Sequence, residues 1–177
     1  MEKTVEIQKC GEEDVVRAGA FYDRVVRWLN EHVNYPRWIC GVYPSEGSAR
    51  AMTEADAQYL CLRGGEIVGA FAICTAPQGK YQKTRWSRDL AEGEYLVLTA
   101  VAVDPELRRQ GLGSQIIRFC VDRAKAGGFR AIRVDIVPTN VPARSLFERN
   151  GFTYAGDVDL ELDIGDIPAF SMYELNW

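Results

Sequence analysis

Two arginines and two glycines lie in a short stretch that could bind phosphate. Arg108 and Arg109 precede Gly111 and Gly113, and a helix is predicted to have begun by Ser114. The free N–H groups at a helix N-terminus, together with its partial positive charge, attract phosphate. Gly111 and Gly113 let the backbone approach a ligand closely and are expected to take positive φ. Guanidinium groups form paired hydrogen bonds with phosphate oxygens. The stretch is therefore predicted to form a pyrophosphate-binding turn.

Other phosphate-binding motifs fit this stretch less well. The dinucleotide pattern G-x-G-x-x-G needs a third glycine where the chain has Ile116, and the NTPase pattern G-x-x-x-x-G-K-[ST] does not occur in the sequence. The spacing that fits is R-x-x-G-x-G, from Arg108 to Gly113, after an apolar strand that ends in V-x-V-D-P. An ordinary strand-to-helix turn with surface arginines is the alternative.

A second motif lies downstream, at residues 140–152. It reads N-x-x-A-x-x-L-F-x-x-x-G-F, and one predicted helix and one predicted strand separate it from the glycine turn. Together the two motifs resemble those of the GNAT N-acetyltransferase superfamily, in which R-x-x-G-x-G binds acetyl-CoA. The resemblance covers about Glu94 to Phe152 and includes the strands around the motifs.

The resemblance implies an N-acetyltransferase with acetyl-CoA as the acyl donor. The strands that end near Val103 and Val137 would run parallel and splay apart, with the pantetheine arm between them. The first strand would pair with the arm, the turn would hold the pyrophosphate, and the second motif would contact the sulfur end. The cofactor-binding residues implied in this way are Val101, Ala102, Val103, Arg108, Arg109, Gln110, Gly111, Leu112, Gly113, Ser114, Asn140, Leu146 and Phe147.

Acetyl transfer to an amine needs a base, because an amine with a pKa near ~10.4 is protonated at neutral pH. Glu94, at the start of the central strand, is the candidate base, acting directly or through water, since family members often carry a glutamate on this strand. A solvated strand-edge carboxylate is the alternative interpretation, and Asp135 is a weaker candidate. The tetrahedral oxyanion also needs a donor, and a backbone N–H near Val101 could serve.

The usual proton donor of the family is missing. Family members often have a tyrosine where this chain has Phe147, which has no proton to give. Tyr154 is the candidate acid, and Tyr173 or a water molecule could replace it. A CoA thiolate, with a pKa near ~8.5, can also leave without full protonation. A non-catalytic acyl-CoA-binding module is therefore a rival hypothesis, and an enzyme for longer acyl chains is another.

The acceptor site is expected in two aromatic segments. Residues 34–45 contain two prolines, which discourage a helix, and residues 76–93 form a long loop of a kind that is usually functional or mobile. The candidate substrate-binding residues are Tyr35, Trp38, Tyr43 and Trp86, although packing of the first segment as a structural plug explains its aromatics equally well. A small amine or amino-acid derivative is the expected acceptor, with a protein N-terminus or lysine as the alternative.

The predicted elements place these residues on a mixed α/β sheet. Apolar alternation, apolar runs and turn signals predict strands at residues 4–9, 58–63, 66–75, 94–103, 130–137, 152–163 and 170–176. Helices are predicted at residues 15–33, 48–57 and 111–126, and another is capped at Thr139 or Asn140 and closed by Gly151. Helices and strands alternate only in the second half, which predicts a mixed α/β sheet. The resemblance implies one GNAT-like domain over residues 1–177, with about six to seven strands flanked by helices.

The composition is that of an ordinary globular protein. The chain of 177 residues has a net charge of −4, which argues against a general nucleic-acid binder. No apolar run approaches the ~18 residues of a membrane span, and the N-terminus lacks a signal-peptide segment. Five widely spaced cysteines without a C-x-x-C pair argue against metal and disulfide frameworks. We therefore expect a cytoplasmic protein without a metal, whose last hairpin could supply the edge of a homodimer.

Overall fold

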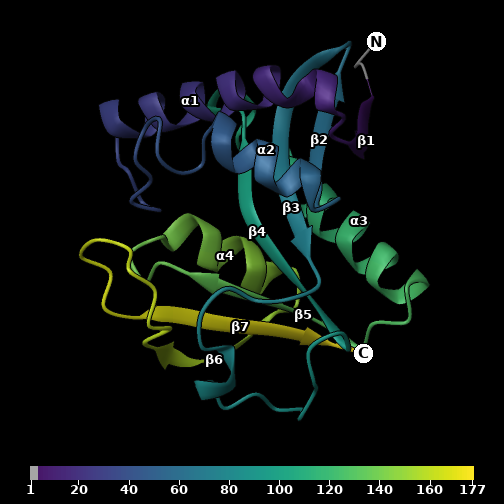
Figure 1. The fold of residues 1–177 in the computed structure, drawn as a ribbon, viewed down its shortest axis with the longest axis vertical. Coiled ribbons are helices and arrows are strands. Elements are labelled where there is room, and N and C mark those ends of the chain that lie inside the picture. The colour runs from purple at the N-terminus through teal and green to yellow at the C-terminus, as the bar shows by residue number, and fades with distance from the viewer. Residues whose placement is uncertain (1–3) are drawn as a thin grey trace. The chain divides into compact units, whose positions relative to one another are not determined.

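The computed structural model describes residues 4–177, which form helices and one mixed sheet (Figure 1). In this part of the chain seven strands follow the order β1-β2-β3-β4-β5-β7-β6. This confirms the expected mixed α/β fold of six to seven strands flanked by helices. The chain divides into two compact units: unit 1 contains the described residues up to Ile73 and Ala100–Ile116, and unit 2 contains Cys74–Thr99 and Ile117–Trp177. A single domain over residues 1–177 stays a prediction.

The elements follow the predicted order along the chain. The strands are β1 (Val5–Lys9), β2 (Gln58–Arg63), β3 (Glu66–Cys74), β4 (Tyr95–Val103), β5 (Ala131–Ile136), β6 (Thr153–Val158) and β7 (Phe170–Asn176). The helices are α1 (Val15–Glu31), α2 (Glu46–Glu54), α3 (Leu112–Ala126) and α4 (Val141–Arg149), with short 3-10 helices η1 (Glu12–Asp14), η2 (Tyr81–Lys83) and η3 (Pro105–Leu107).

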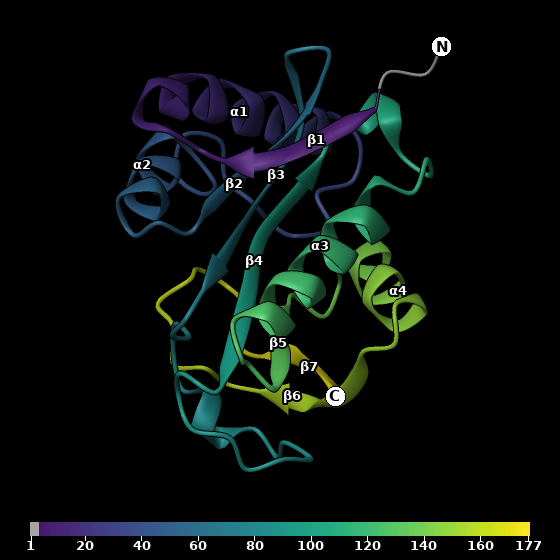
Figure 2. The ribbon, with the colours of Figure 1, turned by 90° about the vertical axis from the view of Figure 1, so that its right-hand side faces the viewer.

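Unit 1 contains three antiparallel strands and two packed helices. β1 pairs with β2, and β2 pairs with β3 through the predicted hairpin at Gly64 and Gly65, whose φ values of 60° and 85° suit glycine. α1 lies alongside α2 (Figures 1 and 2). The two helices approach so closely at Gly19 that a Cβ atom there would lie 2.5 Å from Cβ of Glu46. Glycine at this position therefore allows the helices to pack.

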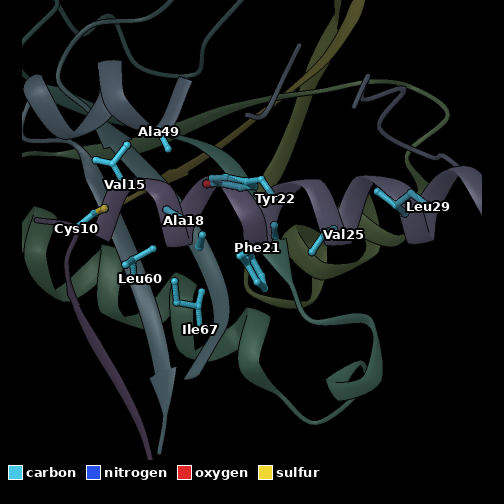
Figure 3. Packing of buried hydrophobic residues seen from close by; sticks show 12 residues of the cluster. Cys10, Val15, Ala18, Phe21, Tyr22, Val25, Leu29, Ala49, Leu60 and Ile67 are labelled. Carbon is cyan, nitrogen blue, oxygen red and sulfur yellow. The ribbon is translucent and has the colours of Figure 1, made fainter. Parts of the chain in front are cut away.

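The apolar face of α1 forms much of the core of unit 1. Its buried residues recur every three or four positions, as the helical periodicity predicts. They pack with Leu60 and Ile67 from β2 and β3 (Figure 3). The buried members of this face are Val15, Ala18, Phe21, Tyr22, Val25 and Leu29.

α2 begins at Glu46 rather than at the predicted Ser48. Ser45 and Ser48 form a capping box, in which the Ser45 hydroxyl accepts the Ser48 N–H and the Ser48 hydroxyl accepts the Ser45 N–H. A capping box usually has Glu or Gln at the position that Ser48 occupies. The sequence therefore did not identify the start of this helix.

One residue within β4 has a left-handed conformation. Ala100 has a φ of 51°, which is uncommon outside glycine. Its carbonyl accepts a 3.0 Å hydrogen bond from the Tyr22 hydroxyl. Further along, the Asp104 N–H donates a 2.9 Å hydrogen bond to the Val68 carbonyl. Both ends of this β4 segment are therefore tied into unit 1.

In unit 2, β5 has a parallel neighbour on one side and an antiparallel neighbour on the other. Its parallel register with β4 joins Tyr95–Val97 to Ala131–Arg133, which are the first three residues of each strand. β7 pairs with every residue of β5, and β6 pairs with β7 (Figure 2). Parallel pairing at the start of two longer strands is the arrangement that the splayed pair requires.

A buried arginine holds the long loop between β3 and β4 in unit 2. Arg133 is 1% exposed, and its Cζ lies 4.3 Å from the Trp86 ring centroid and 4.2 Å from that of Tyr95. Its Nη2 donates a 2.8 Å hydrogen bond to the Arg88 carbonyl. Opposite Arg133 on β7, the Glu174 carboxylate accepts the Ser87 N–H at 2.8 Å. The loop is therefore attached to the sheet at several points.

β6 ends at Val158, whereas the sequence predicted a strand up to Asp163. The Leu160 carbonyl accepts a 3.0 Å hydrogen bond from the Lys80 N–H instead of continuing the ladder with β7. A Cβ atom at Gly79 would lie 2.7 Å from this carbonyl oxygen. The close approach of two loops therefore ends the strand.

Candidate functional site

The glycine turn lies between β4 and α3, as predicted. It begins with η3, where the Asp104 carboxylate accepts the Glu106 N–H at 3.0 Å and pairs with Arg24 at 2.8 Å. Arg109 and Gly111 then take φ values of 62° and 81° before α3 starts at Leu112. Two left-handed residues reverse the chain in this short space. The sequence predicts a positive φ at both Gly111 and Gly113. This is confirmed at Gly111 and wrong at Gly113, which lies in the first turn of α3. The sequence contains no signal for Arg109.

The turn presents backbone and charged side chains to solvent. Arg108, Arg109, Gln110 and Gly111 are exposed, and a Cβ atom at Gly111 would have no heavy atom within 4 Å. The remaining predicted cofactor-binding residues of unit 1 are less exposed: Ala102 and Leu112 are buried, and Val101, Val103, Gly113 and Ser114 are intermediate. This open surface can accommodate an anionic ligand.

Arg108 is held against α1 by an aromatic ring. Its Cζ lies 4.2 Å from the Trp28 ring centroid, and the His32 ring stacks on Trp28 at 3.9 Å with an interplanar angle of 12°. The His32 Nδ1 lies 2.8 Å from the Trp28 carbonyl oxygen. Partial burial lowers the pKa of Arg108, with Tyr35 as the opposing influence. The guanidinium is therefore positioned before any ligand binds.

The aromatic segment between α1 and α2 is organised by Asn34. Its amide nitrogen donates a 2.7 Å hydrogen bond to the Trp38 carbonyl, and its side-chain oxygen accepts the Trp38 N–H at 3.1 Å. Ile39 and Tyr43 form an isolated antiparallel bridge, and Tyr43 is 36% exposed. Tyr35 and Trp38 are partly buried. Three of the four predicted acceptor residues therefore lie on one segment of unit 1.

The second motif forms α4 in unit 2. Asn140 caps the helix, since its side-chain oxygen accepts the Ala143 N–H at 3.3 Å. Phe147 is 4% exposed and packs edge-on against Phe152, with ring centroids 5.0 Å apart. Leu146 is partly buried. The motif is thus a packed helix whose asparagine has a structural bond in addition to its predicted contact with the coenzyme.

Glu94 lies just before β4 in unit 2 and already has two partners. Its carboxylate accepts the Ala91 N–H at 2.8 Å and pairs with Arg130 at 3.3 Å. These contacts, the Ala91 bond first, lower the pKa of the carboxyl group. Glu94 is therefore ionised at neutral pH, and its role as the base stays a prediction.

Tyr154 and Tyr173 lie side by side on β6 and β7 but differ in their surroundings. Their ring centroids are 5.5 Å apart, and Tyr154 is 49% exposed. The Tyr173 ring is buried, and its hydroxyl donates to Glu148 at 2.8 Å while accepting from Arg144 at 3.0 Å. Partial burial, with Asp157 as a further cause, raises the pKa of Tyr154, so this phenol keeps its proton at neutral pH.

Asp135 on β5 is hydrogen-bonded to Tyr81, which lies in the loop between β3 and β4. The Tyr81 hydroxyl donates a hydrogen bond to its carboxylate, and burial raises the pKa of both groups. Trp86, the fourth predicted acceptor residue, donates its indole N–H to the Tyr81 carbonyl at 3.0 Å and stacks on Arg133. The sequence did not predict that Arg133 packs against Trp86 and Tyr95, because a charged residue on an alternating strand normally faces solvent.

Neither a metal cluster nor a membrane-spanning helix is found among the residues that the structure describes. Residues 4–177 contain no group of three or more histidine, cysteine or acidic side chains arranged to hold a metal ion. None of the helices in this part of the chain is long and apolar enough to cross a membrane.

The chain resembles known proteins in both sequence and fold. A family model described as the acetyltransferase (GNAT) family matches residues 20–152. No curated protein matches the sequence. A GNAT-family acetyltransferase from Streptococcus agalactiae 2603 matches with a TM-score of 0.78 and 15% identity, over 100% of this chain and 98% of the other.

Two further solved structures have the same fold. A GNAT-family acetyltransferase from Listeria monocytogenes 4b F2365 gives a TM-score of 0.75 and 19% identity, over 98% of this chain and 95% of the other. The yncA protein of Salmonella typhimurium, solved with its cofactor acetyl-CoA, gives a TM-score of 0.67 and 15% identity, over 97% of this chain and 93% of the other.

Proposed function

Because the chain belongs to the acetyltransferase (GNAT) family, we propose that it transfers an acetyl group from acetyl-CoA to a primary amine of a small molecule or amino-acid derivative. The amine attacks the thioester directly in a ternary complex. The observation that carries the proposal is the exposed turn from Arg108 to Gly111, which joins the end of β4 to the start of α3.

The turn has the chemistry that a diphosphate needs. Its backbone N–H groups stand at the N-terminus of α3, a helix of 15 residues, where the helix dipole favours an anion. The open space beside Gly111 leaves room for phosphate oxygens, and Arg108 and Arg109 supply cationic forks. In this proposal Val101 and Val103 pair with the pantetheine amides, and Asn140, Leu146 and Phe147 contact the sulfur end.

The reaction forms a C–N bond and breaks the C–S bond of the thioester. The amine must lose a proton, and the departing sulfur must gain one or leave as a thiolate. We assign the first task to Glu94, through a water molecule, because its carboxylate is ionised at neutral pH. Tyr154 is assigned the second, because its phenol keeps its proton. Bringing amine and carbonyl together at ~3–3.5 Å supplies much of the remaining acceleration.

A non-catalytic acyl-CoA-binding module is the second candidate function. The residue that favours it is Phe147, which is buried and lacks a hydroxyl group that could donate a proton, at the position where family members often have a tyrosine. Both candidates require coenzyme binding, and only the enzyme releases CoA thiol when an amine is supplied.

The test is a thiol-release assay with acetyl-CoA and a panel of small amines, amino-acid derivatives and short peptides. Titration calorimetry with CoA measures binding in parallel. We expect binding, together with release well above the buffer hydrolysis rate for at least one small amine. Binding with only background release for every acceptor would favour the binding module. Absence of CoA binding would contradict both functions.

A further inference from the structure

Tyr22 makes a buried hydrogen bond to Ala100, the one residue of β4 that has a positive φ. Its side chain lies in the core of unit 1 (Figure 3) and is 1% exposed. The hydroxyl donates to the Ala100 carbonyl at 3.0 Å, and Ala100 has a φ of 51°. A left-handed alanine is strained, so the surrounding structure must hold this conformation in place.

The Tyr22 hydroxyl is fixed from its other side by Gln58. The Gln58 Nε2 donates to this hydroxyl at 3.1 Å and to the Phe71 carbonyl at 3.0 Å, and Gln58 is 2% exposed. Burial raises the pKa of the Tyr22 phenol, so it remains a donor. A polar network inside an apolar core is costly unless its members are satisfied, and a satisfied one is rigid. Tyr22 and Gln58 thereby join α1, β2, β3 and β4.

The bond to Ala100 also fixes the next N–H group. The peptide between Ala100 and Val101 is trans, so its C=O and N–H point in opposite directions. Because the carbonyl points at Tyr22, the Val101 N–H points away from Tyr22. The direction of that donor is therefore set by the phenol and not only by the strand.

We propose that Tyr22 is a positioning residue for acetyl transfer. By holding the Ala100 carbonyl, it aims the Val101 N–H at the thioester carbonyl oxygen, where negative charge develops in the tetrahedral intermediate. The inference rests on the proposed function and adds a residue that has no contact with either substrate. A left-handed residue stabilised by a buried network is the kind of strain that persists where geometry matters for chemistry.

The test is Tyr22→Phe, which keeps the ring in the core and removes only the hydroxyl. Loss of an oxyanion donor lowers kcat by about 10²–10³-fold, and a misdirected donor is expected to cost roughly tenfold or more. KM for acetyl-CoA and the Kd of CoA should change less than about twofold. The matched control is Tyr59→Phe, since Tyr59 is another buried tyrosine of unit 1, 3% exposed.

A spectroscopic measurement separates positioning from stability. In the wild-type protein the carbonyl stretch of bound, carbonyl-labelled acetyl-CoA should move to lower frequency than in water. Part of that shift should be lost in Tyr22→Phe and retained in Tyr59→Phe. If Tyr22→Phe does not fold, Gln58→Met leaves the phenol but removes the group that holds it, and a smaller loss of kcat at unchanged KM is expected.

The outcomes distinguish this inference from the function on which it rests. A wild-type protein without thiol release would contradict the enzymatic function. An active wild-type protein with unchanged kcat and carbonyl frequency in Tyr22→Phe would overturn the positioning role. Parallel losses of kcat, coenzyme affinity and thermal stability, with the carbonyl frequency unmoved, would also overturn it, because they indicate a merely structural residue.

Discussion

The guanidinium of Arg108 lies over the indole of Trp28, with its Cζ 4.2 Å from the ring centroid. The first arginine of the phosphate-binding motif is therefore tied to α1, many residues away in the sequence. A free arginine would have to lose side-chain entropy when it binds phosphate. Here part of that entropy is already lost in the unliganded protein, so Trp28 should contribute to coenzyme affinity without contacting the coenzyme.

Trp28→Leu should therefore weaken CoA binding through Arg108. A cation–π contact of this kind is worth about 0.5–1 kcal/mol, or roughly two- to fivefold in Kd. Arg108→Ala should weaken binding more, and the double variant should match Arg108→Ala alone. Titration calorimetry measures the three values. Trp177→Leu is the control, because Trp177 faces Lys125 in unit 2; an equal loss there would refute the coupling.

Gly111→Ala should weaken coenzyme binding more than it weakens the fold. Gly111 has a φ of 81° and open space where a Cβ atom would lie, so alanine costs about 1 kcal/mol through backbone strain. Gly128 has a φ of 79° and equally open space, so Gly128→Ala should lose the same amount of stability as Gly111→Ala. Only Gly111→Ala should raise the Kd of CoA, by roughly tenfold or more if the methyl group occupies the phosphate site. Equal affinities in the two variants would disprove the turn assignment.

Tyr154→Phe should lower kcat with little effect on stability. A proton donor typically contributes about 10²-fold or more, and Tyr154 is 49% exposed. Tyr173→Phe should instead lower stability with little effect on kcat, because it removes the hydrogen bonds that the hydroxyl of a buried ring makes with Glu148 and Arg144. The expected loss of stability is about 1–3 kcal/mol. Steady-state kinetics and urea unfolding of both variants decide the matter, and a loss of kcat confined to Tyr173→Phe would make Tyr173 the acid.

Glu94→Gln should lower kcat by about 10²-fold or more if its carboxylate receives the amine proton through water. Because the Ala91 N–H and Arg130 lower its pKa, loss of activity on acidification should not arise from Glu94 near neutral pH. The measurement is a pH profile of kcat/KM for the wild-type protein, Glu94→Gln and Asp135→Asn. An acidic limb that disappears only in Asp135→Asn, together with an active Glu94→Gln, would identify Asp135 as the base.

Asp135→Asn should also change how stability depends on pH. Burial raises the pKa of Asp135 above its unfolded value of about 3.9, although the Tyr81 bond opposes this effect. The folded wild-type protein therefore holds this proton longer than the unfolded chain, and the stability it contributes is lost as pH rises from the unfolded to the folded pKa. Urea unfolding across acidic to neutral pH should show Asp135→Asn gaining stability relative to wild type. A difference independent of pH would contradict the raised pKa.

Local signals predicted most of the fold. The apolar run of β4, the glycine turn and the periodicity of α3 predict the bounds of β4 and α3 to within one residue. Asn140, Pro142 and Gly151 did the same for α4, because a cap, a first-turn proline and a closing glycine each act within a few residues. These features need no information about the rest of the chain.

Long-range contacts explain what the sequence missed. Arg109 and Ala100 are left-handed without being glycine, and Ala100 is held by Tyr22, far away in the sequence. Arg133 alternates with apolar residues and would be expected to face solvent, yet the loop that carries Trp86 covers it. In the candidate site, the turn and the second motif could be found from spacing. The partners that set the acidity of Glu94 and Tyr154 could not.

The cysteines described by the structure are all free thiols, and they differ in accessibility. Cys10, Cys61 and Cys120 are buried, Cys74 is partly buried and Cys40 is exposed. Colorimetric thiol reagents that detect released CoA will therefore also react with Cys40. This reaction adds up to one equivalent of signal per protein and resembles a burst of product. A Cys40→Ser variant would remove this signal and would also prevent labelling at Cys40 when another position is labelled through an introduced cysteine.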